Sequence, residues 1–253
     1  MNKEIEELII STSVRIARNL KRIPFNAKKH SAFDSVAKTI AQKPKTVEVI
    51  YGEEDHFRIR AEYEGWNLHS AYKDAKAVAD EIEATNDIAR DKDLGYLTAC
   101  TTNVGTGMRV SVLMFMPAIT LSNHIGNIYN QIRNRHITIR GTYGEGSPSS
   151  GYMYQISNQS CNYMNEAEIL ALVEEAVLHL GKLELKLQAT LYKNNRKALT
   201  EKVMRSWDFF TRTKTLSDAE IVEHIAILRL GSSLGILNSD EVEIALMPYN
   251  LSK

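Results

Sequence analysis

The chain has few cysteines and no long hydrophobic run. Its 253 residues contain two cysteines, Cys100 and Cys161, which are too few for a disulfide framework and suit a reducing compartment. No apolar segment approaches the length of a membrane-spanning helix, and the N-terminal MNKEIEELII lacks the pattern of a signal peptide. We therefore expect a cytoplasmic protein with no membrane partner.

The chain also lacks an excess of charge and the spacing of a metal site. Lys and Arg number 31 and so do Asp and Glu, so no global charge attracts nucleic acid. The seven histidines show no HExxH motif and no paired Cys/His spacing, which predicts no metal ion held by protein ligands. The length is sufficient to bury a substantial core in one large domain or two unequal ones.

A turn rich in Gly, Asn and Thr lies in the middle of the chain. It reads GYLTACTTNVGTGMR over residues 95–109 and continues into the apolar VSVL of residues 110–113. Gly105 and Gly107 allow backbone N–H groups to point inward, and Arg109 supplies a planar, permanently charged fork. The turn therefore suits phosphate, although a plain structural turn gives the same pattern.

Three other segments place arginine beside acidic or flexible stretches. The segment GEEDHFRIR, residues 52–60, puts three acids before Arg58 and Arg60, which occupy alternate positions of a strand-like run. The segment RGTYGEG, residues 140–146, has an Arg and a Glu around a turn. The segment STSVRIARN, residues 11–19, adds two arginines near the N-terminus. The repeated pairing of arginine with carboxylate suggests a site for charged ligands.

Together these blocks resemble the phosphagen kinase superfamily, and most closely the bacterial protein arginine kinases. The blocks occur in the family's order over most of residues 9–160, and several long blocks in register are far more specific than one short motif. The resemblance implies transfer of the γ-phosphoryl group of ATP to a guanidinium nitrogen, with Mg²⁺ arriving on ATP. The matching blocks are STSVRIARN, GEEDHFRIR, GYLTACTTNVGTGMRVSV, IRGTYGEG and YQISNQ.

Arginines carry the nucleotide site that the resemblance implies. Phosphoryl transfer needs alignment and positive charge more than covalent help, and bidentate arginine–phosphate contacts supply both. Arg15, Arg58, Arg109 and Arg140 are therefore interpreted as a phosphate clamp, although each could instead be a surface ion-pair partner. The nucleotide-binding positions implied are Ser11, Thr12, Ser13, Val14, Arg15, Arg58, Arg109, Val110, Ser111, Val112, Leu113, Arg140, Gly141, Thr142, Tyr143, Gly144 and Glu145.

Two glutamates and one cysteine complete the implied catalytic set. Glu54 and Glu145 match the family's guanidinium-binding glutamates, and Glu54 is the better candidate for taking the proton. The cysteine that matches the family's thiolate modulator is Cys100, which the resemblance implies lies beside the guanidinium. The simpler alternatives are a solvated acidic turn at Glu54 and a small buried apolar residue at Cys100. We expect His56 to be structural, as a hydrogen-bonding partner of its loop.

Hydrophobic periodicity predicts an α+β fold, in which an antiparallel sheet is flanked by helices and followed by a helical C-terminal extension. Residues 1–190 are expected to form the catalytic domain and residues 191–253 a helical C-terminal domain. The Gly/Ser-rich loop 142–151 is interpreted as a lid over the nucleotide. Predicted strands cover 46–51, 56–62, 109–116, 136–140 and 153–156, and predicted helices cover 67–87, 165 to about 187, and 217 to about 231.

Several positions depart from the family's pattern. The first block normally has two arginines in Ser-x-Arg-x-Arg, and Ser13 replaces the first of them. Gly52 replaces an Asn, Thr101 replaces a Pro, and the segment between residues 19 and 52 is short. We also find no Arg-Asp-x-x-Arg-Ala motif, with which typical members bind phosphoarginine. These departures keep open a weakened relative that binds nucleotide or (phospho)arginine as an adaptor.

The C-terminal stretch favours a protein-borne acceptor. The run RSWDFFTRTKTLSDAEIVEHIAILRLGSSLGIL resembles the protein arginine kinases, and the first block begins too early for the N-terminal helical domain of kinases that act on free guanidines. The resemblance implies proteins with exposed arginine as substrates and a role in bacterial protein quality control and stress response; an activator protein and a homodimer stay open. A helix-turn-helix reading of the same stretch is disfavoured by the neutral charge.

Overall fold

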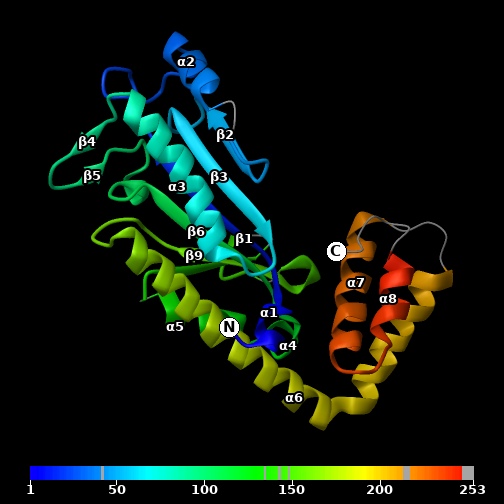
Figure 1. The fold of residues 1–253 in the computed structure, drawn as a ribbon. Helices are drawn as coiled ribbons and strands as arrows, with labels where there is room; N and C mark the ends of the chain where they lie inside the picture. Colours follow the sequence, from blue (N-terminus) through cyan, green and yellow to red (C-terminus); the bar gives the residue numbers. More distant parts are fainter. Residues whose placement is uncertain (41–42, 134, 142–143, 148, 213–216, 247–253) are drawn as a thin grey trace. The chain divides into compact units, whose positions relative to one another are not determined.

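The computed structural model describes all residues except 41–42, 134, 142–143, 148, 213–216 and 247–253 (Figure 1). The chain divides into two compact units. The first unit comprises Met1–Met114, Gln131–Ile139 and Gln155–Leu178. The second unit comprises Phe115–Asn130, Arg140–Tyr154 and His179–Lys253. The antiparallel sheet flanked by helices confirms the predicted α+β class.

A seven-stranded sheet has the strand order β2-β3-β1-β6-β9-β7-β8, and β4 and β5 form a separate two-stranded sheet. No described helix combines the length and apolar character needed to cross a membrane. The strands are β1 (Ile9–Arg18), β2 (Val47–Tyr51), β3 (Phe57–Glu64), β4 (Arg90–Asp91), β5 (Gly95–Tyr96), β6 (Met108–Phe115), β7 (Ile137–Gly141), β8 (Gly144–Glu145) and β9 (Met153–Asn158). The helices are α1 (Lys3–Glu6), α2 (Ser31–Thr39), α3 (Leu68–Thr85), α4 (Pro117–Leu121), α5 (Ile125–Arg133), α6 (Glu166–Arg212), α7 (Asp218–Ser233) and α8 (Ser239–Leu246), with short 3-10 turns at Thr101–Asn103 and Ser150–Tyr152.

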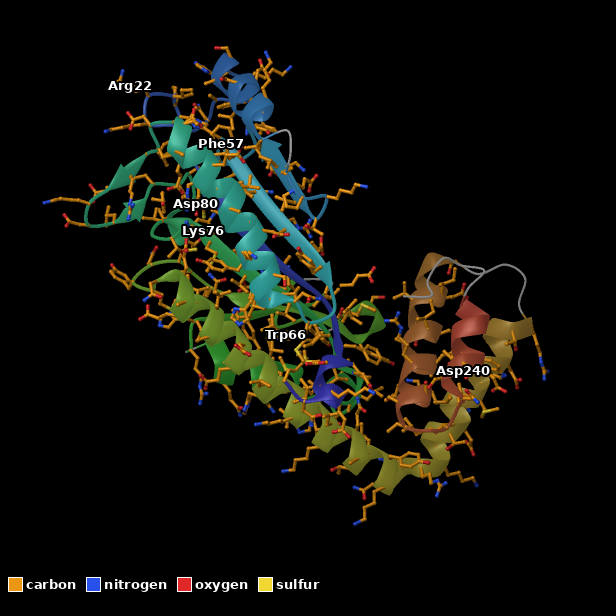
Figure 2. All side chains as sticks on the ribbon, viewed as in Figure 1. Arg22, Phe57, Trp66, Lys76, Asp80 and Asp240 are labelled. Carbon is orange, nitrogen blue, oxygen red and sulfur yellow. The ribbon has the colours of Figure 1, made fainter. Side chains whose placement is uncertain are left out.

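One face of the sheet in the first unit is apolar and is covered by α3. Val14 of β1 is paired with Ala61 of β3 and Val110 of β6, and all three are fully buried. Figure 1 shows α3 lying across these strands. Figure 2 labels Lys76 and Asp80, which form an ion pair one turn apart on α3. Because successive side chains of a strand alternate between faces, the other residues of the same strands point to the opposite face.

That opposite face is polar and rich in arginine. On β1 it carries Ser11, Ser13 and Arg15. The antiparallel register places Arg15 opposite Arg60 of β3 and Arg109 of β6. The strand alternation therefore separates a core face from a face that presents several positive charges, and the candidate site lies on the second.

The predicted strands and the helix at 67–87 are confirmed, but β1 was not predicted. In β1 the apolar alternation is interrupted because Thr12 lies on the buried face, where a hydrophobic residue is expected. Its hydroxyl donates a hydrogen bond to the carbonyl oxygen of Gly65 at 2.7 Å, which satisfies the buried polar group. A threonine whose partner lies 53 residues away looks polar in the sequence although it behaves as a core residue.

The start of α6 was predicted correctly and its end was not. Asn165 and Glu168 exchange side-chain-to-backbone hydrogen bonds of 2.9 and 2.7 Å and so form the expected capping box. The helix does not end near Leu187 but continues to Arg212, with a non-helical backbone at Asn195. The polar run 193–197 interrupts the apolar periodicity, yet it contains no breaker that would end a helix. The predicted domain division at 190/191 consequently falls inside α6.

The second unit contains a helical module built from the end of α6, α7 and α8. Its core consists of Phe210, Ile225, Leu228 and Val242. The predicted capping box of α7 is confirmed: the Ser217 side chain accepts from the backbone N–H of Glu220, and the Glu220 carboxylate accepts from that of Ser217. In Figure 1 the two C-terminal helices lie beside the end of α6.

Glu184 is a fully buried carboxylate that joins α6 to α4. Its two oxygens accept hydrogen bonds from the backbone N–H groups of Ala118 at 2.8 Å and Ile119 at 2.9 Å. Gln188 adds a third bond of 2.9 Å. Burial raises the pKa of the Glu184 carboxyl, and these hydrogen bonds oppose that shift. Glu184 thus satisfies the first donors of α4, which otherwise have no helical partner.

Replacing Glu184 with alanine is expected to lower the free energy of unfolding by about 2–4 kcal/mol, because it leaves two buried N–H groups unpaired and opens a cavity. Urea unfolding followed by circular dichroism measures the change. Lys182→Ala is the matched control, since Lys182 is exposed on the same helix and should change stability by less than about 0.5 kcal/mol. Equal urea midpoints for Glu184→Ala and wild type would contradict the role assigned to this carboxylate.

Candidate active site

Arg15 lies at the centre of an arginine cluster on the polar face of the sheet. Burial lowers the pKa of Arg15, and the charges of Arg58 and Arg109 lower it further, whereas Glu54 and Cys161 act in the opposite direction. A pKa lowered by neighbouring arginines means that like charges are held close together. Such an arrangement is electrostatically unfavourable alone and becomes favourable when an anion binds between the guanidinium groups.

Arg109 is held at one side of the cluster by the end of β9. Its Nη2 donates to the carbonyl oxygens of Asn158 and Gln159, each at 3.4 Å. The buried Asn158 side chain accepts from the Val110 N–H at 2.8 Å and donates to the Met108 carbonyl at 3.1 Å. Asn158 therefore fixes the strand that carries Arg109. It lies in the block YQISNQ but was not among the predicted site residues.

Arg58 and Arg60 lie on β3 and have acidic partners. Arg58 forms an ion pair with Glu53, and Arg60 forms one with Glu62 at 2.7 Å. Arg60 was not in the predicted set, although its register opposite Arg15 places it on the same face. The alternation of Arg58 and Arg60 in the sequence was the signal that could have identified it.

Glu54 is exposed at the tip of a turn that is anchored by its neighbour. Asp55 is 4% exposed and accepts hydrogen bonds from Asn19 Nδ2 at 2.7 Å and from the Ala99 N–H at 2.9 Å. Within the described residues, Glu54 itself makes no hydrogen bond or ion pair, and its charge acts on Arg15. The turn thus holds a carboxylate toward solvent beside the arginine cluster. Asp55 and Asn19 were missed because each looks like an ordinary polar residue in the sequence.

The same turn explains the glycine at position 52. Gly52 has a φ of +62°, and a Cβ there would collide with the carbonyl oxygen of Lys28.

His56 is structural, as predicted: its Nδ1 accepts from the Leu20 N–H at 2.9 Å, so its Nε2 donates to the Pro24 carbonyl at 2.8 Å. The short segment after β1 therefore packs directly onto the acidic turn, and this close approach requires glycine.

Cys100 lies on a loop that Asp55 ties to the Glu54 turn through Ala99. Its half-exposed sulfur is 3.0 Å from the hydroxyl of Thr102. The second cysteine, Cys161, is buried and donates its thiol proton to the Met108 carbonyl at 2.8 Å. Burial raises the pKa of the Cys161 thiol, while Arg109 and Arg15 lower it. The structure therefore leaves Cys100 accessible and places Cys161 in the core beneath the arginines.

In the glycine-rich turn, the backbone N–H of Gly105 does not point toward the proposed phosphate site. Its N–H donates to the Tyr96 carbonyl at 3.2 Å and is thus used within the protein, not directed toward an anion. The expectation of an inward-pointing N–H at this position is wrong because the turn packs against the β5 strand and the chain at Cys161. Positive charge at the site comes from arginine side chains and not from this backbone group.

The predicted nucleotide positions on β1 and β6 separate by face. Thr12, Val14, Val110 and Val112 are completely buried on the apolar side. The positions on the polar face are Ser11, Ser13 and Arg15 on β1 and Arg109, Ser111 and Leu113 on β6. Side chains of the first set serve the core, so only the second set presents side chains on the face that carries the arginines.

In the second unit, β7 and β8 bring Arg140 and Glu145 together. The two residues are directly opposite in the strand register, as are Gly141 and Gly144. Arg140 donates to Glu145 Oε1 from Nε at 3.2 Å and from Nη2 at 3.0 Å. The predicted positions Thr142 and Tyr143 lie outside the described residues. Among the described residues, no group of three or more His, Cys, Asp or Glu is gathered as metal ligands would be.

The sequence matches a known family model over most of its length. Residues 2–187 match the family model described as ATP:guanido phosphotransferase, C-terminal catalytic domain. The chain belongs to this family. The matched segment includes every strand of the ATP:guanido phosphotransferase sheet and ends within α6.

Curated relatives of this guanido phosphotransferase chain are named protein-arginine kinase. The relative from Caldanaerobacter subterraneus subsp. tengcongensis is 37% identical over 82% of this chain and 63% of its own length. The relative from Clostridium acetobutylicum is 38% identical over 79% of this chain and 58% of its own length. The chain thus spans about three-fifths of the length of these two relatives. A relative from Clostridium kluyveri is 31% identical over 91% of this chain and 81% of its own length.

Solved structures support the guanido phosphotransferase fold. A lombricine kinase crystal structure has a TM-score of 0.63 with 21% identity, covering 73% of this chain and 68% of that chain. A duplicated taurocyamine kinase from Schistosoma mansoni has a TM-score of 0.60 with 19% identity, covering 81% of this chain and 38% of that chain. At these identities the likeness concerns the fold.

Proposed function

We propose that this chain transfers the γ-phosphoryl group of Mg²⁺-ATP to the guanidinium of arginine side chains in proteins. The observation that carries the proposal is the cluster of Arg15, Arg58 and Arg109 on one sheet face, with the exposed carboxylate of Glu54 beside it. The first group suits phosphate oxygens and the second suits a cationic acceptor. Membership of the guanido phosphotransferase family supports both assignments.

The proposed reaction is an in-line displacement on the γ-phosphorus. A guanidinium nitrogen forms the new N–P bond, the bond to the β-phosphate oxygen breaks, and ADP leaves. Glu54 takes the proton that the nitrogen loses, and Glu145 holds other N–H groups of the acceptor. Arg15, Arg58, Arg109 and Arg140 are proposed to stabilise charge on the transferring group. Mg²⁺ enters with ATP and neutralises phosphate charge.

The remaining elements of the proposal come from the relatives. Because these are named protein-arginine kinase, we propose proteins with exposed arginine as acceptors. We also propose Cys100 as a thiolate beside the acceptor, since its loop is tied to the Glu54 turn. We further propose a cytoplasmic location, a role in protein quality control and stress response, an activator protein and a homodimer.

Incubation with γ-labelled ATP, Mg²⁺ and an arginine-rich protein tests the proposed reaction. Label should enter the protein and be lost in acid, because a phosphoramidate hydrolyses there while phosphoserine survives. Replacing the arginines of the acceptor with lysine should abolish labelling. Acid-stable label, or equal labelling of the lysine version, would contradict the proposal.

A catalytically weakened adaptor is the second candidate, and Ser13 is the observation that favours it. Ser13 stands on the polar face, opposite Ser111 of β6 and Glu62 of β3, at a position where the family resemblance implies arginine. The cluster therefore lacks one phosphate partner that the family pattern supplies. An adaptor would bind nucleotide or arginine without measurable transfer.

Ser13→Arg is expected to raise the turnover number by about tenfold, which corresponds to about 1.4 kcal/mol gained at the transition state. The gain should appear in kcat more than in KM, because charge develops on the transferring group. Steady-state rates at saturating Mg²⁺-ATP measure it. Ser70→Arg is the matched control, since it adds the same charge at an exposed position of α3, which covers the opposite face of the sheet, and it should leave the turnover number unchanged. No gain for Ser13→Arg, together with undetectable wild-type transfer, would favour the adaptor.

A further inference from the structure

Arg140 and Tyr129 contact different oxygens of the Glu145 carboxylate. Arg140 donates to Oε1 from Nε and Nη2, at 3.2 and 3.0 Å. The hydroxyl of Tyr129 donates to Oε2 at 3.2 Å. All three residues belong to the second unit. Tyr129 matches none of the motifs identified in the sequence, and its contact with Glu145 becomes visible only in the structure.

The position of Tyr129 is fixed by its helix and by a glycine. Within α5, Ile125 and Ile128 are each 5% exposed and anchor the helix, while Tyr129 is half-buried beside them. Gly146 follows Glu145 directly and has a φ of +68°. A Cβ at Gly146 would lie 2.9 Å from Tyr129 Cδ1. The Tyr129 ring therefore packs against the backbone of Gly146, where any side chain would be in the way. Packing of the ring, as well as the hydrogen bond, therefore fixes the position of the Tyr129 hydroxyl beside Glu145.

Arg140 and Tyr129 differ in their effect on the charge of the Glu145 carboxylate. Arg140 is a guanidinium, the same chemical group as the proposed acceptor, and its ion pair with Glu145 occupies one carboxylate oxygen. Tyr129 is neutral, so its hydrogen bond orients the carboxylate plane without cancelling the charge. The terminal torsion of a glutamate is broad when nothing holds it. An oriented carboxylate can receive a planar guanidinium with less loss of freedom.

We propose that Tyr129 is a positioning residue for the acceptor guanidinium. Its hydroxyl keeps its hydrogen bond to Oε2 of Glu145 while Oε1 exchanges Arg140 for the arginine of the protein substrate. This inference rests on the proposed function, in which Arg140 contacts the nucleotide phosphates and Glu145 the acceptor. When Arg140 turns to phosphate, the ion pair between Arg140 and Oε1 of Glu145 is broken. The Tyr129 hydroxyl then keeps the carboxylate in the orientation that the incoming guanidinium needs.

Steady-state kinetics of Tyr129→Phe tests the proposal, because phenylalanine keeps the ring against Gly146 and removes only the hydroxyl. The KM for an arginine-containing protein substrate should rise roughly five- to tenfold, as expected for losing one hydrogen bond of ordinary net strength. The KM for Mg²⁺-ATP, the kcat and the unfolding temperature should stay near wild type. A merely structural role would instead lower the unfolding temperature or change both KM values.

Tyr152→Phe is the matched control. Tyr152 also lies in the second unit, and its hydroxyl contacts Lys202 at 3.5 Å and not Glu145. Its loss should leave the KM for the protein substrate unchanged. An unchanged KM in Tyr129→Phe, or an equal rise in both variants, would overturn the positioning role.

Equilibrium binding separates this inference from the proposed function. Titration calorimetry with a peptide containing one arginine, in the presence of Mg²⁺ and a non-hydrolysable ATP analogue, needs no catalysis. If the wild type binds the peptide but transfers no phosphoryl group, the proposed activity fails. Weaker binding by Tyr129→Phe would still support the positioning role in that case, and equal binding would overturn it. Absence of peptide binding by the wild type would overturn both.

Discussion

Replacing Glu54 with glutamine is expected to lower phosphoryl transfer by about 10²–10⁴-fold, the usual range for loss of a general base. Glutamine keeps the shape of the side chain but cannot take a proton from the acceptor nitrogen. Nucleotide affinity should change little, because Glu54 is an exposed carboxylate beside the cluster and not one of its arginines. Rates at saturating protein substrate and calorimetric titration with Mg²⁺-ATP measure the two quantities separately.

The matched control for this prediction is Glu64→Gln. Glu64 is an exposed acid at the end of β3, whose register places it opposite Ser11 and away from the Asp55-anchored turn. It should keep wild-type transfer. If Glu54→Gln also keeps wild-type transfer at saturating substrate, the proton acceptor lies elsewhere and the role of this turn must be reassigned.

Arg109→Ala is expected to reduce kcat/KM for Mg²⁺-ATP by about 10³-fold, which is the scale of an arginine that stabilises a transferring phosphoryl group. The carbonyl oxygens of Asn158 and Gln159 accept from its Nη2 and orient the guanidinium at the end of β9. Arg109→Lys should restore only part of the loss, because an ammonium cannot reproduce the planar fork. Nucleotide titrations and initial rates of both variants measure the effect.

Arg135→Ala provides the control for the loss of an arginine in the same unit. Arg135 is exposed in the loop before β7 and belongs to no predicted site. Its removal should leave nucleotide affinity and turnover unchanged. Unchanged nucleotide affinity in Arg109→Ala would remove Arg109 from the phosphate clamp, whatever the rate.

Local patterns predicted the parts of the fold that depend on local physics. Alternation identified β3 and β6, and the pairing of a capping residue with a glutamate three positions later identified the starts of α6 and α7. The same criteria missed β1, because Thr12 is a core residue whose hydrogen-bond partner is remote in sequence. They also ended α6 too early, since a polar surface does not stop a helix that lacks a breaker.

The candidate site shows a similar division. The arginines and glutamates could be named because their blocks match a family, whereas the residues that hold them could not. Asp55 acts through Asn19, 36 residues away, and through Ala99, 44 residues away. Tyr129 reaches Glu145 from a helix that contains no recognised motif. These supporting residues act through tertiary contacts between segments far apart in the chain, so no spacing in a single sequence identifies them.

In the proposed reaction, the ion pair between Arg140 and Glu145 would couple the affinities of the two substrates. Breaking an exposed pair of this kind costs about 0.2–1 kcal/mol, which corresponds to a factor of roughly 1.4 to 5 in an equilibrium constant. If Arg140 turns to the nucleotide, the acceptor no longer has to displace it. By thermodynamic reciprocity, the acceptor then strengthens nucleotide binding by the same factor. Each substrate would then be held more firmly in the ternary complex than alone, and a contact within the resting protein would be the source of cooperativity between its ligands.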